Sequence, residues 1–396
     1  MVPIRRGLGL LAAAGLLVAG IAAANPPSAE ADVAAVPPAE LNSGVTRAGT
    51  AVPIDMALTY GGSRRAEIRA PGSTYIKVHF GSFKLAHGDY VTVASPDRRE
   101  VHTYFGEDAR GSAFTKHGGS GFAAMSVDGD TAIVTLHATG SRNPARLGVR
   151  INQYFRGYDT AETAAHNPGT LSVCGTDARR DVACYQTSHP TEYTRANAVA
   201  RQLLNGIGHC TAWRVGNTNR MLTNQHCMEN ASDLRASEFQ FDYQCATCGG
   251  NNPRTGTKVS GLELIKISGL NQLDYALFSV NNFDRVQSFG TLYLETRESI
   301  AGERIYIPGH GDVKPKRLSL FEDSQGGATC KIDTVSAGVN TGYRCDTSGG
   351  NSGSPVLAAS SHKVIALHHL GGCPNWGTRI KLVYDQIRTD IDNTPR

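Results

Sequence analysis

The sequence predicts an all-β protein of two modules, with one helix at its C-terminal end. Three observations lead to this fold class. Residues 51–156 contain segments in which apolar and polar residues alternate, separated by Gly, Asp and Pro turns. The chain beyond residue 172 continues with short apolar runs and few helical patterns, and all nine cysteines lie there. Residues 381–391 place apolar side chains at helical spacing, which predicts the final helix.

The first 24 residues have the pattern of a secretory signal peptide. Arg5 and Arg6 precede an apolar run, and small residues at 22–24 and 29–31 form candidate cleavage sites. We place the cleavage after residue 24, or as late as residue 31. The apolar run is short and rich in Ala and Gly, which disfavours a membrane anchor. We therefore expect a secreted, extracellular protein that has no contact with a membrane once the signal is removed.

Three segments follow the signal peptide. Residues 25–50, rich in Ala, Pro and Ser, predict a flexible lead-in. Residues 51–156 predict an antiparallel β-sandwich, because four alternating segments occur within about 100 residues. Residues 157–172 predict a linker, and 173–396 the second module. The four alternating segments are residues 74–80, 90–94, 131–137 and 147–154.

Composition excludes some classes of partner. The formal net charge is only +4 and charged residues make up 19% of the chain, so neither nucleic acid nor an anionic membrane is expected as a partner. In an exported protein the cysteines should form disulfides. Cys245-Ala-Thr-Cys248 could be half of a zinc site, but no second cysteine pair has matching spacing. We expect no metal and no cofactor.

The segment 345–355, Cys-Asp-Thr-Ser-Gly-Gly-Asn-Ser-Gly-Ser-Pro, places Ser352 among glycines. Glycine permits backbone conformations that a Cβ forbids, and such a turn can aim several N–H groups at one point. A serine that attacks a carbonyl needs these donors, because negative charge develops on the carbonyl oxygen. The N–H groups of Gly350 and Ser352 are the expected oxyanion hole.

A candidate base lies upstream of this serine. His226 ends the segment Arg-Met-Leu-Thr-Asn-Gln-His, and Asp274 stands at the start of the apolar run 275–280. Histidine can accept the serine proton near neutral pH, and a buried carboxylate fixes its tautomer. His226, Asp274 and Ser352 therefore form a candidate catalytic triad.

The motifs Thr-Asn-Gln-His-Cys, Asp-Tyr-Ala-Leu and Gly-Asn-Ser-Gly-Ser-Pro together resemble chymotrypsin-fold serine endopeptidases. The nearest branch is that of bacterial glutamyl endopeptidases and their trypsin-like and lysyl endopeptidase relatives. The resemblance covers residues 172–394 and implies two packed six-stranded β-barrels with a C-terminal helix. It further implies hydrolysis of protein or peptide substrates through an acyl-enzyme, and we expect a monomer. Such enzymes are commonly made as zymogens, so we favour removal of residues 25–172 over their retention as an accessory domain.

The resemblance also implies disulfide pairings. Cys210 would bond to Cys227 beside the base, and Cys174 to Cys373. Cys184 would bond to Cys245 or Cys248, leaving the other one unpaired. Cys330 and Cys345 form a plausible fourth bridge that leads into the nucleophile loop.

Two preferences for the residue before the cleaved bond remain open. Asp346 lies six residues before Ser352, the offset at which trypsin-like enzymes hold the aspartate that binds Arg or Lys. In glutamyl endopeptidases, a threonine and a strand histidine receive the substrate carboxylate instead. Thr347 matches that threonine, and His368 is the best match for the histidine, with His369 as the fallback. We favour cleavage after Lys or Arg slightly, with cleavage after Glu as the alternative.

Other features bear on substrate and regulation. Leu370, Gly371 and Gly372 are expected to form the strand edge that pairs with the substrate backbone. Asn351 replaces the aspartate that binds a freed N-terminus in the trypsin branch, so latency is expected from the N-terminal module blocking the cleft. The rival functions are a secreted, non-catalytic binding protein on the same fold, and an esterase using the same triad.

Overall fold

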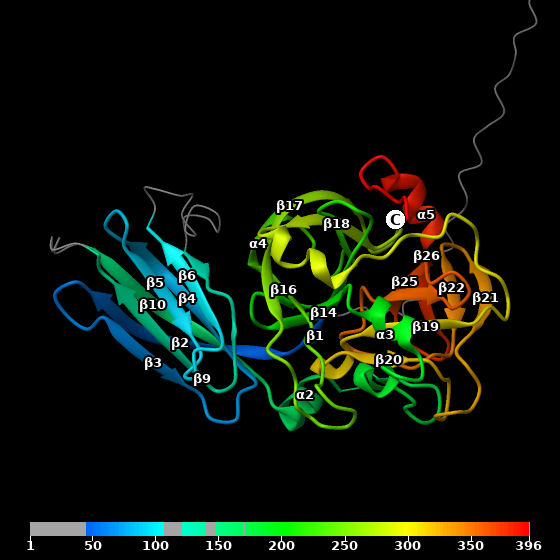
Figure 1. The fold of residues 1–396 in the computed structure, drawn as a ribbon, viewed down its shortest axis with the longest axis horizontal. Helices are drawn as coiled ribbons and strands as arrows, with labels where there is room; N and C mark the ends of the chain where they lie inside the picture. Colours follow the sequence, from blue (N-terminus) through cyan, green and yellow to red (C-terminus); the bar gives the residue numbers. More distant parts are fainter. Residues whose placement is uncertain (1–44, 107–120, 140–146, 169–170, 396) are drawn as a thin grey trace, which may run out of the picture. The chain divides into compact units, whose positions relative to one another are not determined.

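In the computed structural model, the N-terminal module is a sandwich of two antiparallel sheets (Figure 1). The structure describes residues 45–106, 121–139, 147–168 and 171–395, so the expected signal peptide lies outside the described residues. The first sheet consists of β2 (Gly49–Thr59), β10 (Gly148–Gly157), β4 (Tyr75–Lys84), β7 (Phe122–Ala123) and β8 (Val127–Asp128). The second consists of β3 (Arg65–Arg69), β9 (Thr131–His137), β5 (Tyr90–Ala94) and β6 (Val101–Phe105).

The apolar face of each sheet forms the core of this module. Alternation in β9 buries Ala132, Val134 and Leu136, and these residues pack with Ile68 and Val78 from other strands in one cluster. Period-2 alternation puts every second side chain on the same face of a sheet, which is why the sequence pattern predicts these strands. The predicted β-sandwich is confirmed, with each of the four predicted strands present.

A closed six-stranded barrel forms the first half of the second module. The order β14-β13-β16-β17-β18-β15 closes because β15 pairs with both β18 and β14. A short additional strand, β1 (Thr46–Arg47), pairs with β14. The barrel strands are β13 (Val199–Leu204), β14 (Gly208–Arg214), β15 (Met221–Thr223), β16 (Ser237–Phe241), β17 (Thr257–Ser268) and β18 (Tyr275–Val280).

The second half is an eight-stranded antiparallel sheet that carries the loop with Ser352. Its order is β12-β20-β19-β24-β25-β26-β22-β21, and in a separate pair β11 bonds to β23, the strand that directly precedes that loop. These strands are β11 (Leu171–Ser172), β12 (Arg180–Asp181), β19 (Ile305–Gly309), β20 (Arg317–Ser319), β21 (Ile332–Ala337), β22 (Asn340–Tyr343), β23 (Thr347–Ser348), β24 (Pro355–Ala358), β25 (Val364–Leu370) and β26 (Asn375–Arg379). The chymotrypsin-like fold class implied by the resemblance is confirmed, although the second barrel is an eight-stranded sheet whose end strands β12 and β21 are not paired with each other, where six strands were expected.

Helices are short. The α-helices are α2 (Thr160–His166), α3 (Pro190–Ala196), α4 (Ala231–Ala236) and α5 (Ile380–Ile387), and the 3₁₀ turns are η2 (Val182–Tyr185), η3 (Phe283–Arg285), η4 (Gln287–Phe289) and η5 (Gly311–Val313). The final helix α5 confirms the predicted one and ends four residues earlier. It buries Ile380, Val383 and Ile387 in the core shared by both barrels. In the described part of the chain, no helix has the length and apolarity needed to cross a membrane.

The segments expected to be lead-in and linker contain ordered structure. Strand β1 lies within residues 25–50, and α2 lies within residues 157–172. Asp159 and Glu162 form a capping box at the start of α2, each side chain accepting from the other's backbone N–H. Composition alone could not reveal either element, because β1 is stabilised by pairing with a distant strand and α2 by a two-residue cap.

Candidate active site

Strand pairing in the first barrel brings His226 and Asp274 together. His226 lies three residues after β15, and Asp274 immediately precedes β18. The two strands are antiparallel, with Thr223 opposite Ala276, so the end of one strand lies beside the start of the other. Asp274 has a left-handed backbone conformation, φ +44°, which aspartate tolerates better than most residues.

Asp274 holds His226 through two hydrogen bonds. The His226 Nδ1 lies 2.8 Å from Oδ2 of Asp274, and the His226 backbone N–H donates to Oδ1 at 3.0 Å. Burial alone would raise the pKa of Asp274, but the charge and hydrogen bonds of His226, with those of His369, hold this pKa well below its usual value. The carboxylate therefore stays ionised and fixes the orientation of the imidazole.

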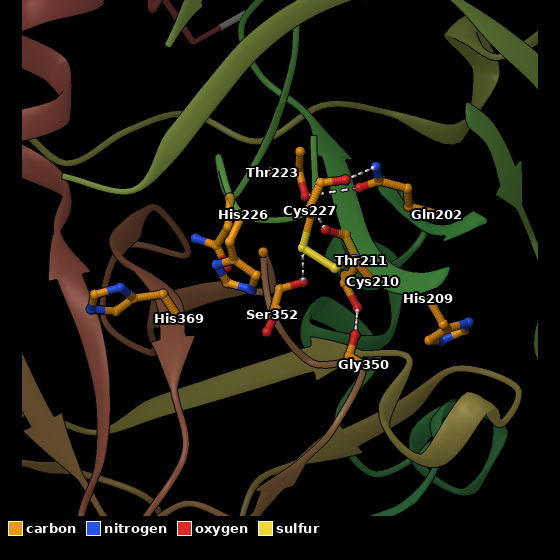
Figure 2. Close-up of a disulfide and its surroundings, with 12 residues drawn as sticks. Gln202, His209, Cys210, Thr211, Thr223, His226, Cys227, Gly350, Ser352 and His369 are labelled. Atoms are coloured by element: carbon orange, nitrogen blue, oxygen red, sulfur yellow. Dashed lines mark hydrogen bonds between the residues drawn. A yellow bond between two sulfur atoms is a disulfide. The ribbon is translucent and has the colours of Figure 1, made fainter. Parts of the chain in front are cut away.

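Ser352 lies beside this pair in the turn between β23 and β24. Figure 2 shows the His226 ring next to the Ser352 side chain and the disulfide that follows the histidine. The Nε2 atom of His226 is buried and makes no hydrogen bond to any residue that the structure describes. The serine backbone is fixed, because its carbonyl accepts from the Thr211 N–H at 2.9 Å.

Two glycines in the turn permit the chain to pass this close to the first barrel. Gly350 has φ +98°, and a Cβ there would lie 2.6 Å from the His209 ring; Gly353 has φ +86°, and its Cβ would lie 2.1 Å from the Thr211 carbonyl. Within the described residues, neither the Gly350 N–H nor the Ser352 N–H donates to another group. Both donors therefore remain available for an oxyanion.

Four disulfides are present, and they match the expected pairings. Cys174 bonds to Cys373, Cys210 to Cys227 and Cys330 to Cys345. Cys184 bonds to Cys248, which leaves Cys245 as the unpaired, buried cysteine. Cys210 and Cys227 lie with His226 in one cluster of potential metal ligands. Because the two sulfur atoms are bonded to each other, they offer no thiolate to a metal.

A second histidine, His369, contacts Asp274. Its Nδ1 lies 3.2 Å from Oδ2 of Asp274, and its Nε2 lies 2.8 Å from Oδ1 of Asn340. The resemblance predicts His369 only as a fallback substrate ligand. Strand alternation could have predicted that His369 lies apart from the expected pocket. Neighbouring residues of a strand point to opposite faces, so His368 and His369 cannot both face one pocket.

Asp346 and Thr347 are both fully buried and bind other parts of the chain. One carboxylate oxygen of Asp346 accepts from the Cys174 N–H at 3.0 Å and the other from the Ala178 N–H at 2.7 Å. Burial raises the pKa of Asp346 to about 6, against the lowering effect of these two hydrogen bonds. The Thr347 hydroxyl donates to the Asn375 side chain at 2.9 Å.

His368 is also buried, with its Nδ1 2.8 Å from the Tyr343 hydroxyl. Burial is the main reason that its pKa is lowered to about 3, so the ring is neutral at ordinary pH. Leu370 ends β25, and Gly371 and Gly372 follow it directly. The structure therefore places all the expected pocket residues on β23, on β25 or directly beside these strands.

Arg179 supports the turn that carries Ser352, and no local sequence pattern predicts this contact. Its guanidinium is almost fully buried, and one nitrogen donates to the Ser348 hydroxyl. Other nitrogens bind the carboxylates of Asp177, at 2.8 Å, and Asp312, at 3.2 Å. The Asp312 N–H in turn donates to the Gly349 carbonyl at 2.8 Å. The turn is therefore held from behind by an ion-pair network.

The fold is that of a chymotrypsin-fold serine protease. Residues 210–367 match the family described as trypsin-like peptidase domain. The secreted RxLR effector protein 73 of Plasmopara viticola is 30% identical over 331 residues, which cover 78% of each chain. This span is longer than 173–396, so the similarity extends into the N-terminal module. Residues 210–367 thus contain a trypsin-like peptidase domain, and the chain belongs to the same family as the Plasmopara viticola protein.

Solved structures of similar fold are more distant. A Glu endopeptidase in complex with MPD is 19% identical, with a TM-score of 0.43, and covers 56% of this chain and 100% of its own. The Rv3671c protease in its inactive form is 12% identical, with a TM-score of 0.39, and covers 55% of this chain and 98% of its own.

Proposed function

We propose that this protein is a secreted serine endopeptidase whose nucleophile is Ser352. The observation that carries the proposal is the buried His226–Asp274 pair beside a serine in a glycine turn with two available N–H donors. Ser352 Oγ attacks the peptide carbonyl and gives its proton to Nε2 of His226. The N–H groups of Gly350 and Ser352 stabilise the oxyanion, and the imidazolium then protonates the leaving amine. Water releases the acyl group by the reverse sequence.

Digestion of a denatured, unrelated protein tests this function. The secreted chain is incubated with that protein, with and without a serine-directed fluorophosphonate, and the cut sites are read by mass spectrometry. Cuts that the inhibitor abolishes, together with labelling of Ser352, support the endopeptidase. Labelling with cleavage of small esters alone would support the esterase instead. Absence of both cuts and labelling, before and after a cut in residues 157–172, would contradict the proposal.

A secreted binding protein is the second candidate function. It is favoured by one observation, that the curated relative is described as an effector. A peptidase fold used only for recognition does not need a catalytic triad, whereas all three triad residues are present here. The absence of labelling in the digestion experiment, with the chain folded, would favour this candidate.

We propose that the preference for the residue before the cleaved bond follows His368 and not Asp346. The preference for Lys or Arg rests on a pocket carboxylate, yet both oxygens of Asp346 already accept backbone N–H groups. When the Tyr343 hydroxyl donates to Nδ1 of His368, the neutral ring carries its proton on Nε2. That nitrogen can donate to a carboxylate, which supports cleavage after Glu.

Substitutions at the two candidate residues separate these preferences. His368→Leu should lower kcat/KM for peptides cleaved after Glu by roughly tenfold or more, because a buried substrate carboxylate would lose a donor. Tyr343→Phe, which removes only the hydroxyl, is the matched control and should cost less. Profiling with a peptide library checks both. Preferential cleavage after Lys or Arg that Asp346→Asn abolishes would assign the preference to Asp346 instead.

Arg179 is expected to act as a positioning residue for the nucleophile turn. Arg179→Ala should lower kcat roughly tenfold or more and change KM little, a smaller loss than the direct removal of an oxyanion donor. Arg179→Lys keeps the charge without the planar fork and should fall between wild type and Arg179→Ala. The matched control is Arg344→Ala, whose side chain is 57% exposed and pairs with Asp333. Equal losses in Arg179→Ala and Arg344→Ala would contradict this role.

A further inference from the structure

The first barrel buries three charged side chains on one face. Arg201 on β13, Glu238 on β16 and Lys258 on β17 are each at most 4% exposed. Neighbouring barrel strands β13, β16 and β17 are paired side by side. Charged groups are rarely buried in this way unless they are paired, so each of these side chains requires a partner of opposite charge.

The β-sandwich supplies that partner for Glu238. The Lys77 ammonium lies 2.7 Å from Oε2 of Glu238, and the Ser126 N–H donates to the same oxygen at 2.9 Å. The Ser126 hydroxyl donates to the other carboxylate oxygen. Both oxygens of Glu238 are therefore satisfied by residues of the N-terminal module.

Lys258 is satisfied in the same way. Its ammonium lies 2.7 Å from a carboxylate oxygen of Glu100 and 2.9 Å from one of Asp128, and it donates to the Ser126 carbonyl at 3.0 Å. The barrel thus offers one carboxylate and one ammonium to groups of opposite charge on the sandwich. The two faces are complementary in charge.

Apolar and aromatic contacts surround these ion pairs. The Arg201 guanidinium lies 4.1 Å from the ring centre of Tyr243 in the barrel and 5.7 Å from that of Tyr75 in the sandwich. The Tyr75 hydroxyl donates to the Gly206 carbonyl at 2.8 Å. Tyr75 also packs with Ala48 and Leu203 in a small buried cluster. The interface therefore has the apolar contacts that stable association requires.

The same barrel strands continue to the candidate active site. Strand β1 pairs Thr46 with His209 of β14, and two residues further along β14 the Thr211 hydroxyl donates to the Gly350 carbonyl. Gln202, next to Arg201 on β13, donates to the Cys227 carbonyl at 3.0 Å. The strands that contact the sandwich thus also hold Cys227, which follows His226, and Gly350, two residues before Ser352.

We infer that the β-sandwich is a retained partner of the peptidase barrels. It stays bound through its contacts with Glu238, Lys258 and Arg201 after any cut in residues 157–172, and it supports the active geometry. The sandwich and the barrels belong to one compact unit. This conclusion replaces the expected role of the N-terminal module as a propeptide that blocks the cleft and is then removed. The retention is independent of the proposed function, whereas its effect on activity rests on that function.

A cut between the two parts tests the retention. A recognition sequence for a site-specific protease is inserted between Pro168 and Leu171 of the full chain carrying Ser352→Ala, and the cut protein is run on size exclusion at low and high salt. No cysteine precedes Cys174, so no disulfide can hold the parts together. We expect both parts to elute together at either salt concentration, because buried pairs are screened little. Separation in native buffer would overturn the inference.

Substitutions in the interface identify what holds the parts together. In the cut protein, Lys77→Ala should raise the dissociation constant roughly a hundredfold, because Glu238 is then left buried without its cation. Ser126→Ala removes one hydroxyl contact and should raise the dissociation constant by a smaller factor. This variant keeps the test valid if Lys77→Ala folds poorly. The matched control is Arg150→Ala, since Arg150 pairs with Asp55 on the exposed surface of the sandwich. Unchanged binding in both interface variants would overturn the inference.

The activity of the cut chain with Ser352 in place tests whether the sandwich supports the active geometry. We expect the cut complex to keep the turnover of the uncut chain, and the cut chain carrying Lys77→Ala, diluted until the parts separate, to lose at least roughly tenfold. Higher turnover after removal of the sandwich would show that it inhibits, and would overturn its supporting role. Inactivity of the uncut, cut and separated forms alike would count against the proposed function, while elution of the two parts together would still establish retention.

Discussion

Replacing Ser352 with alanine should abolish turnover and leave the fold intact. The substitution removes the Oγ that forms the acyl-enzyme, so kcat should fall by roughly 10⁴- to 10⁶-fold, leaving only the contribution of binding and the oxyanion donors. The backbone contacts of the turn persist, because the residue 352 carbonyl still accepts from the Thr211 N–H. Turnover of a peptide substrate and thermal unfolding of the same preparation check the two halves of this expectation.

Ser354→Ala is the matched control for the nucleophile. Ser354 lies two residues further along the same turn, fully buried, and its hydroxyl accepts from the Asn351 side chain at 3.3 Å. Its loss should weaken the turn modestly, and fluorophosphonate labelling should persist. Labelling should vanish only in Ser352→Ala. Turnover or labelling that survives in Ser352→Ala would refute Ser352 as the nucleophile.

The candidate site was predictable where local sequence determines it. Ser352 sits between glycines whose positive φ angles a turn of this kind requires, and His226 and Asp274 each flank a short apolar strand. These are features of single segments, so they can be read without knowing the fold. The strands of the sandwich were predictable for the same reason, because alternation within one strand reflects its own two faces.

Contacts between distant segments were not predictable in this way. His369 reaches Asp274 across 95 positions, and Lys77 reaches Glu238 across 161. Nothing in the local sequence of either partner specifies the other. The same holds for Asp346: its offset from Ser352 predicts a pocket carboxylate, but that offset does not reveal that its oxygens accept N–H groups from residues 174 and 178. An offset fixes position along the loop, but burial and partners decide what the group can bind.

Replacing Asp274 with asparagine should lower kcat by roughly 10⁴-fold at neutral pH. In the native site Oδ2 accepts from Nδ1–H of His226, which leaves Nε2 unprotonated and able to take the serine proton. An asparagine NH₂ at that position would donate to Nδ1 and force the proton onto Nε2. The imidazole would then be in the wrong tautomer while its position changed little. Kinetics at saturating substrate, with the unfolding midpoint as a fold check, measure this effect.

The pH dependence of stability gives an independent readout of the same carboxylate. Because the pKa of Asp274 is lowered in the folded protein, its ionisation stabilises the fold above the unfolded pKa of about 4. That contribution is lost as pH falls through the lower, folded pKa. The stability difference between wild type and Asp274→Asn should therefore shrink as pH falls below about 4.

His369→Gln separates fixation of the tautomer from a general loss of contacts around Asp274. This variant removes the second imidazole from Oδ2 and leaves the His226 contact in place. Its loss in kcat should be far smaller than that of Asp274→Asn, since Asp274 still sets the tautomer of His226. Equal losses of activity in the two variants would contradict fixation of the His226 tautomer as the role of Asp274.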